Sequence, residues 1–98
     1  MTELDVRDKV RLLPHNPGVY QFFDVEGKIL YVGKAKDLRN RVSSYFAKSH
    51  TDGKTAALVR KIVDLRTIVV PTEFEAWLLE NSLLKEHQPR YTILLRDD

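Results

Sequence analysis

Residues 16–33 read NPGVYQFFDVEGKILYVG and contain two short runs of aromatic and β-branched residues around a turn. The first run is Gly18 to Phe23 and the second is Lys28 to Val32, with Asp24-Val25-Glu26-Gly27 between them. Runs of this composition around a turn that contains glycine predict a β-hairpin. We therefore begin from a hairpin and ask what the flanking sequence adds to it.

The pairing register of this hairpin decides where its tyrosines lie. If Phe23 pairs with Lys28 across a four-residue turn, Tyr20 lies directly opposite Tyr31. Side chains alternate between the two faces of a strand, so both tyrosines then share one face. Cross-strand aromatic pairs also stabilise sheets, by roughly 0.2–1 kcal/mol, so the pair by itself is equally consistent with a purely structural role.

The segments around the hairpin carry helical and extended signals. Apolar residues at helical spacing predict four helices, over residues 1–15, 37–46, 54–65 and 73–87. A capping box at the start of the last helix supports its boundary. Apolar β-rich runs predict two extended segments, over residues 67–70 and 91–95. The order predicts an α+β domain in which helices cover a small sheet, with residues 1–98 as one domain and residues 1–15 as its helical lead-in.

Composition narrows the class of protein. The chain has 98 residues, 43% of them hydrophobic and 31% charged, which is an ordinary balance for a globular domain. It has no cysteine, which excludes a disulfide framework and a cysteine-based zinc site and is typical of a reducing, cytoplasmic setting. No apolar run approaches the roughly 18 residues of a membrane span.

Positive charge is concentrated in the middle of the chain. Residues 34–66 carry nine basic and three acidic side chains, although the net charge of the whole chain is only +2. Four of the basic residues directly follow the hairpin: Lys34, Lys36, Arg39 and Arg41. This pattern predicts a surface for a polyanion such as DNA, and solvated helix faces remain the alternative.

Phenols and cations are expected to meet at the end of the hairpin. Arg41 and Tyr45 are four residues apart on a predicted helix, so they lie on one face of it. The strand that carries Tyr31 leads directly into this helix through Lys34, and Tyr20 lies on the neighbouring strand. Cations that bind phosphate oxygens, beside phenols that donate or accept protons, suit a phosphodiester. The alternative is an exposed basic helix above tyrosines packed in the core.

Glu80 is the most unusual residue of the last predicted helix. At about 100° per residue, it falls within the helix's apolar arc. The other members of that arc are Ala76, Trp77, Leu79, Leu83 and Leu84. An unpaired buried carboxylate is costly, so Glu80 needs a partner. A hard divalent cation such as Mg²⁺, often held by one or two carboxylates, is one candidate. A lysine or arginine in a structural salt bridge is the other.

The motifs resemble a known nuclease superfamily. The paired motif of the GIY-YIG nucleases resembles two tripeptides of this chain, Gly18-Val19-Tyr20 and Tyr31-Val32-Gly33. Ten residues separate the two tripeptides, and each has valine in place of isoleucine. Four further short motifs are similar to those of the UvrC-type branch of that superfamily: Asn16-Pro17, Lys34-Ala35-Lys36-Asp37-Leu38, Arg41-Val42-Ser43-Ser44-Tyr45-Phe46 and Leu78-Leu79-Glu80. The resemblance extends from about residue 12 to residue 98.

This resemblance implies a fold, an activity and partners. The fold is a small three-stranded antiparallel sheet flanked by helices. The activity is a metal-dependent DNA endonuclease that uses one Mg²⁺ or Mn²⁺ ion and makes the incision on the 3′ side of a lesion in bacterial nucleotide excision repair. The partners are damaged double-stranded DNA and UvrB, which is contacted mainly through regions outside this chain. The isolated domain is expected to be a monomer in the cytoplasm.

The resemblance also implies roles for individual residues. By motif position, Tyr31 matches the general base, Glu80 the sole carboxylate ligand of the metal, and Arg41 the phosphate-binding arginine. The supporting shell matches Tyr20, Lys34 and Tyr45, and the DNA-binding set is Lys34, Lys36, Arg39 and Arg41. Thr92 stands where the family usually has asparagine. This change keeps open one alternative, a catalytically degenerate DNA-binding or assembly module. A stand-alone structure-specific nuclease, as in other branches of the superfamily, is a further alternative.

Overall fold

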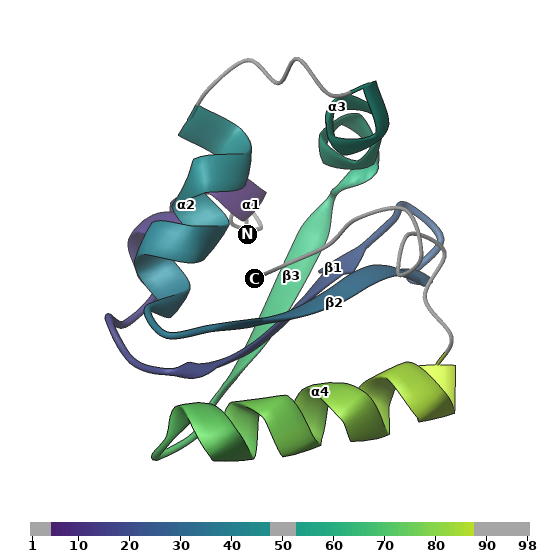
Figure 1. Cartoon of the computed structure of the whole chain (residues 1–98). Coiled ribbons are helices and arrows are strands. Elements are labelled where there is room, and N and C mark those ends of the chain that lie inside the picture. The colour runs from purple at the N-terminus through teal and green to yellow at the C-terminus, as the bar shows by residue number, and fades with distance from the viewer. Residues whose placement is uncertain (1–4, 48–52, 88–98) are drawn as a thin grey trace.

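The computed structural model describes residues 5–47 and 53–87, which form three strands and four helices (Figure 1). Along the chain the elements are α1 (Val6–Arg11), β1 (Gly18–Phe23), β2 (Ile29–Ala35), α2 (Leu38–Ala47), α3 (Gly53–Lys61), β3 (Asp64–Val69) and α4 (Glu73–His87). Their order agrees with the order predicted from the sequence, and the extended segment predicted over residues 91–95 lies outside the described residues. Within the two described ranges, no helix combines the length and the apolar composition needed to cross a membrane.

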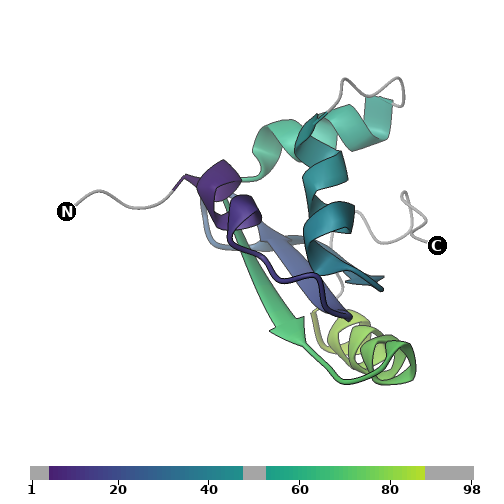
Figure 2. The same ribbon diagram turned by 90° about the vertical axis from the view of Figure 1, so that its left-hand side faces the viewer.

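The three strands form one antiparallel sheet in the order β2-β1-β3, so β1 is central. Figure 2 shows α4 on one side of this sheet and the other three helices on the opposite side. The expected fold class, an α+β domain with a small antiparallel sheet between helices, is therefore confirmed. Because β2 is an edge strand, the two helical layers come closest to each other along its outer side.

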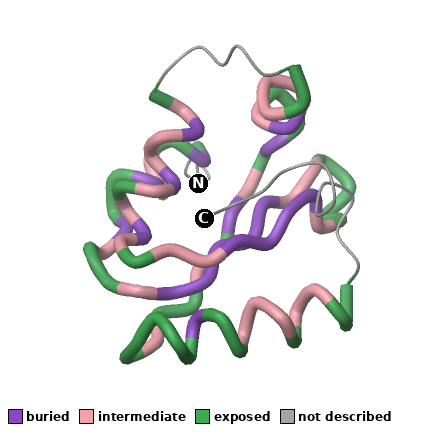
Figure 3. Tube along the Cα trace, in the orientation of Figure 1, coloured by how far each residue is buried: buried purple, intermediate pink, exposed green. Residues whose placement is uncertain are grey.

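The sheet separates two clusters of buried side chains. The larger cluster joins α1, α2 and α3 to the aromatic face of the sheet, and it includes Tyr20, Phe22 and Tyr45. The smaller cluster packs Ala76 of α4 against the opposite face. Burial is concentrated on the strands and on the inner sides of the helices, while most of α4 is only partly covered (Figure 3). Fully burying a large apolar side chain contributes roughly 1.5–3 kcal/mol, so the aromatic cluster dominates stability.

The predicted hairpin register is wrong by two residues. Tyr31 lies opposite Phe22, and Tyr20 lies opposite Gly33. The loop is shorter than expected, because the amide of Asp24 donates to the carbonyl of Lys28 at 2.9 Å and closes a three-residue loop. A β-bulge after Phe22 then adds one more residue on the β2 side.

A shift of two residues leaves every side chain on its expected face, because the strand period is two. Tyr20 and Tyr31 therefore still share a face as diagonal neighbours, with ring centroids 6.1 Å apart. Gly27 makes the short loop possible, since its φ of +81° is a backbone conformation that glycine adopts without strain.

Two further expectations are corrected by the way the chain packs. The helix predicted to run to Leu65 ends at Lys61, because β3 begins at Asp64 and pairs with β1. An apolar Leu65 suits the buried side of a helix and the buried face of a strand equally, and its side chain is buried here. Its position in the apolar pattern therefore could not show which element it belongs to. Trp77 was predicted to lie on the apolar arc of α4, but its side chain is 48% exposed. The apolar arc of α4 is wider than the part of α4 that packs on the sheet, and this packing is centred on Ala76.

Gly18 gives the first testable prediction. A Cβ atom at this position would lie 2.4 Å from the carbonyl oxygen of Ile68 and 2.7 Å from a methyl group of Leu38. Backbone of the neighbouring strand has no room to move away, so we expect Gly18→Ala to destabilise the domain by about 1–3 kcal/mol. Gly53→Ala is the matched control, because nothing lies within 4 Å of a Cβ there. Equal melting temperatures for the two variants would contradict this account of Gly18.

Candidate active site

The predicted site residues meet at the outer edge of β2. Tyr31 and Lys34 are carried by this strand, Arg41 and Tyr45 come from α2, and Glu80 comes from α4 on the other side of the sheet. The carboxylate of Glu80 lies near Lys34, whose ammonium and backbone amide both favour its ionised form. The site thus joins both helical layers across the edge of the sheet.

Three tyrosines form a hydrogen-bonded cluster under this edge. The hydroxyl oxygens of Tyr20 and Tyr45 are 2.9 Å apart, and Tyr31 is also hydrogen-bonded to Tyr45. The ring centroid of Tyr45 lies 5.8 Å from that of Tyr20 and 6.5 Å from that of Tyr31. Tyr20 has no solvent exposure at all, whereas Tyr31 and Tyr45 retain 3% and 7%. Tyr20 can therefore support its neighbours but cannot touch a substrate.

Burial controls the protonation of these phenols. It is the largest cause that raises the pKa of Tyr20 and of Tyr31 well above the ordinary value, because a buried phenolate loses its hydration. The neighbouring Tyr45 and the negative charge of Glu80 raise the pKa of Tyr31 further. The guanidinium of Arg41 acts in the opposite direction on both phenols. In the domain by itself, Tyr31 therefore holds its proton at neutral pH.

Arg41 is held in place from two directions. Its guanidinium carbon lies 5.6 Å from the centre of the Tyr45 ring, a cation–π distance, and its side chain is hydrogen-bonded to Tyr20. Its backbone amide donates to the carbonyl of Asp37 at 3.0 Å in the first turn of α2.

Asp37 fixes the start of α2 and thereby the position of Arg41. Its carboxylate accepts the amide of Asn40 at 3.0 Å and lies 2.8 Å from Nδ1 of His15. The Asn40 amide and then His15 hold the pKa of Asp37 below its usual value. This arrangement is a helix cap, and His15 supports the capping carboxylate of Asp37.

A pocket of about 310 Å³ lies between the end of β2 and the start of α2. Among its lining residues are three of the four predicted DNA-binding cations, Lys34, Lys36 and Arg41. Lys36 is also paired with Glu73 of α4, with Nζ and the carboxylate oxygen 3.8 Å apart. The pocket is therefore a cationic depression that can receive an anion such as a phosphate.

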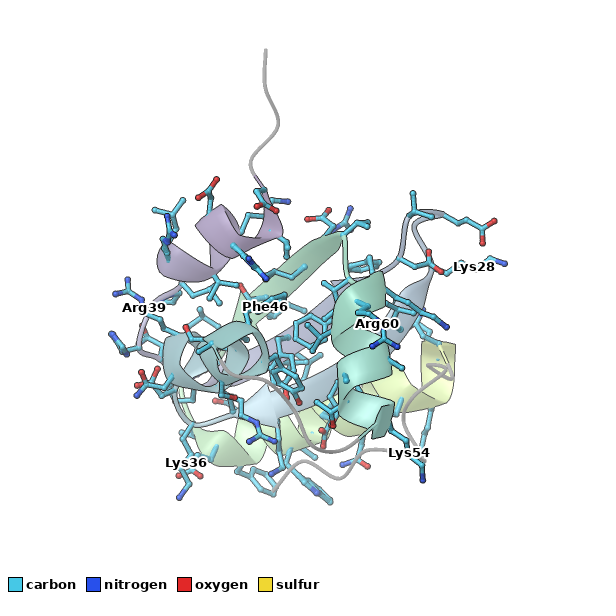
Figure 4. All side chains as sticks on the ribbon, turned by 90° about the horizontal axis from the view of Figure 1, so that it is seen from above. Lys28, Lys36, Arg39, Phe46, Lys54 and Arg60 are labelled. Carbon is cyan, nitrogen blue, oxygen red and sulfur yellow. The ribbon has the colours of Figure 1, made fainter. Side chains whose placement is uncertain are left out.

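Arg39 stands apart from this group. Its Nε atom donates to the backbone carbonyl of Leu13 at 2.6 Å, so part of its guanidinium is committed to the segment between α1 and β1. Figure 4 shows Lys36 and Arg39 at one margin of the molecule, with Lys54 and Arg60 on the distant α3. The basic middle third of the sequence is thus divided into separate groups, and only one of them adjoins the tyrosines.

Glu80 is half-buried and carries an uncompensated charge. Its pKa is raised because burial outweighs the favourable effects of the Lys34 ammonium and amide. In the described part of the chain, no lysine, arginine or histidine forms an ion pair with it. Of the two partners considered for Glu80, a cation from outside the chain is therefore favoured over a structural salt bridge.

The described residues fit a metal ion of a particular type. They contain no group of three or more acidic, histidine or cysteine side chains that could enclose a metal. Mg²⁺ does not need such a cage, because it keeps several waters and uses one or two carboxylates together with substrate phosphate oxygens. Glu80 beside the cationic pocket matches this requirement.

One partner in this site could not have been found from the sequence. The backbone amide of Lys34 favours the ionised form of Glu80, and its availability depends on the pairing register of an edge strand. The sequence signals Lys34 only through its charge. Thr92 lies outside the described residues.

Comparisons with known proteins agree with this geometry. The fold and site define a GIY-YIG domain, and the sequence model of the UvrC-like GIY-YIG domain matches residues 16–93. The chain therefore belongs to the UvrC-like GIY-YIG family. Similar relatives include UvrABC system protein C of Flavobacterium psychrophilum, 64% identical over 90 residues, and that of Porphyromonas gingivalis, 57% identical over 97 residues. These matches cover 92% and 99% of this chain but only 15% and 16% of the relatives.

Solved structures of one relative extend the comparison to three dimensions. The N-terminal GIY-YIG endonuclease domain of UvrC from Thermotoga maritima, bound to magnesium as its catalytic divalent cation, is 38% identical, with a TM-score of 0.81. The alignment covers 93% of this chain and 99% of that one. An asparagine-to-alanine variant of the same domain, also bound to its catalytic divalent cation, gives a TM-score of 0.82 at 38% identity and covers 97% and 100% of the two chains.

The raised pKa of Glu80 predicts how its substitution affects stability. The folded state binds the Glu80 proton more tightly than the unfolded state, so ionisation of Glu80 destabilises the metal-free fold as pH rises. Glu80→Gln keeps a carbonyl for the Lys34 amide and removes the charge. In EDTA, we expect this variant and the wild type to melt at the same temperature at about pH 4, where an ordinary carboxyl group titrates. At about pH 7, we expect the variant to melt at an equal or higher temperature than the wild type.

Melting curves across this pH range test the prediction, with Glu86→Gln on the exposed side of α4 as the control. A large loss of stability in Glu80→Gln at neutral pH would instead indicate a structural salt bridge. Breaking a buried ion pair from one side leaves the other charge unpaired.

Proposed function

We propose that this domain hydrolyses DNA phosphodiester bonds with a single divalent cation held by Glu80. The observation that carries the proposal is the half-buried Glu80 carboxylate, whose pKa is raised and whose negative charge reaches the phenol of Tyr31. A DNA-binding module without catalysis has no use for a desolvated carboxylate beside a phosphate pocket. The endonuclease domain of T. maritima UvrC, described as bound to magnesium, supports the same conclusion.

Tyr31 is the residue that we propose as general base. It is carried by the edge strand β2 and retains 3% exposure, while Tyr20 has none. Positive charge must be near Tyr31 before it can accept a proton, because burial and Glu80 hold its pKa high. A divalent cation held by Glu80 would supply that charge, and it would also stabilise the departing 3′ oxygen.

Arg41 and Lys34 are proposed to hold the scissile phosphate in the pocket beside Tyr31. Both line that pocket, and Arg41 is held firmly by Tyr20 and the ring of Tyr45. A guanidinium fixed in advance stabilises the negative charge that develops on the phosphate in the transition state. Tyr20 and Tyr45 are then positioning residues that connect Arg41 to Tyr31, and Lys36 and Arg39 contribute to DNA binding outside the reacting group.

The biological setting is also proposed from the relatives. Proteins named UvrABC system protein C match nearly all of this chain, so we place residues 1–98 as the nuclease domain of such a protein. Its task is then the incision on the 3′ side of a lesion in damaged double-stranded DNA. UvrB is the partner that positions it, and the bacterial cytoplasm is where that DNA lies. The domain by itself is proposed to be a monomer.

Removing Arg41 should abolish most incision without unfolding the domain. We expect Arg41→Ala to lower the rate of Mg²⁺-dependent cutting by about a hundredfold or more, as for other preorganised groups that stabilise transition-state charge. Arg60→Ala on the exposed side of α3 removes the same charge far from the site and should leave the rate nearly unchanged. Incision of a damaged duplex, beside circular dichroism, measures both effects. Equal rates for both variants would exclude Arg41 from the phosphate site.

The raised pKa of Tyr31 predicts an alkaline pH profile. Only the phenolate accepts a proton, and it is the minor form at neutral pH because the pKa is raised. The incision rate at saturating Mg²⁺ should therefore increase by roughly tenfold per pH unit between about pH 6 and pH 8. Tyr31→Phe should remove the activity and leave the fold intact. A rate independent of pH in this range would exclude Tyr31 as the general base, provided that cutting itself limits the rate.

A further inference from the structure

Two stacked aromatic side chains lie exposed on α4. Phe74 is 65% exposed and Trp77 is 48% exposed, and their ring centroids are 6.1 Å apart with only 22° between the ring planes. Neither side chain belongs to either cluster of buried residues. Large exposed aromatic groups that the fold does not use mark interaction sites. We call this pair the aromatic shelf.

The shelf adjoins the candidate active site along one flank of α4. Trp77 is three residues before Glu80 and four residues after Glu73, so the three side chains lie on neighbouring turns of the same flank. Both acidic residues lie near the end of β2, since the charge of Lys34 acts on Glu80 and Glu73 pairs with Lys36. The shelf therefore begins one helical turn from the Glu80 carboxylate, and Glu73 connects it to Lys36, which lines the cationic pocket.

We propose that the aromatic shelf stacks a nucleobase of the DNA strand that is cut. A nucleotide combines an anionic phosphate with a flat aromatic base, and the structure offers a cationic pocket and flat exposed rings side by side. Stacking accepts any base, because every base presents a π-face. This inference rests on the proposed nuclease function.

The chain contains one tryptophan, so its tryptophan fluorescence reports on Trp77 alone. The probe is single-stranded oligothymidylate, titrated into the domain in EDTA so that no cutting occurs. We expect the emission of Trp77 to be quenched as the oligomer binds. An abasic oligomer of equal length carries the same phosphates without bases, and it should bind more weakly and leave the emission nearly unchanged. This comparison separates base stacking from attraction to phosphates.

Variants test the shelf by affinity for a fluorescein-labelled oligothymidylate. Loss of one stacked base typically weakens binding by about tenfold, so we expect this increase in Kd for Trp77→Leu and less than about a twofold change for Trp77→Phe. Leu12→Ala is the control, because Leu12 is 70% exposed at the end of α1, on the opposite side of the sheet from α4. Its Kd should equal that of the wild type. All four proteins should show the same melting temperature, because the side chains concerned are exposed.

Any of three results would overturn the proposal that the aromatic shelf stacks a base. They are Trp77 emission that oligothymidylate leaves unchanged, equal quenching of that emission by the abasic oligomer, and equal affinity of Trp77→Leu and the wild type for oligothymidylate. An emission shift that depends on protein concentration without DNA would assign the shelf to a second copy of the chain and would also overturn it. Failure of the nuclease proposal looks different. A domain that shows base-dependent quenching yet never incises DNA with Mg²⁺ or Mn²⁺ supports the shelf and excludes the nuclease.

Discussion

A fully buried phenol connects the core of this domain to its candidate active site. The hydroxyl of Tyr20 has no access to solvent, so it must be hydrogen-bonded within the protein, and its partners are Tyr45 and Arg41. Tyr45 in turn is hydrogen-bonded to Tyr31. The packing of β1 against α2 therefore also sets the positions of the groups proposed for catalysis. Stability and site geometry depend on the same few contacts, and neither can change without the other.

The layered architecture explains why the site lies where it does. Most of the aromatic cluster packs on one face of the sheet, and Glu80 comes from the other face. β2 is one of the two edge strands of the sheet, and side chains from both layers approach one another along it. The carboxylate is desolvated there and the Lys34 ammonium compensates its charge only in part, which is unfavourable for the free domain. Such an arrangement is typical of a residue kept for function at some cost in stability.

Local patterns in the sequence predicted the elements well and their mutual placement less well. The hairpin, its shared tyrosine face and the unusual position of Glu80 all followed from alternation and helical spacing. The register did not, because a three-residue loop and a bulge at Phe22 move the strands in ways that composition cannot distinguish. The boundary at Lys61 was missed because Leu65 is buried in a helix or a strand alike. The exposure of Trp77 depends on how much of α4 the sheet covers, which is a tertiary property.

The position of Glu80 near Lys34 has a further consequence for solubility. Of the described strands, β2 pairs only with β1, so its outer edge could template the addition of a strand from another molecule. Negative charge on Glu80, together with the charged side chain of Lys34, disfavours such pairing. The carboxylate that we propose as the metal ligand is therefore also expected to make this edge less prone to self-association.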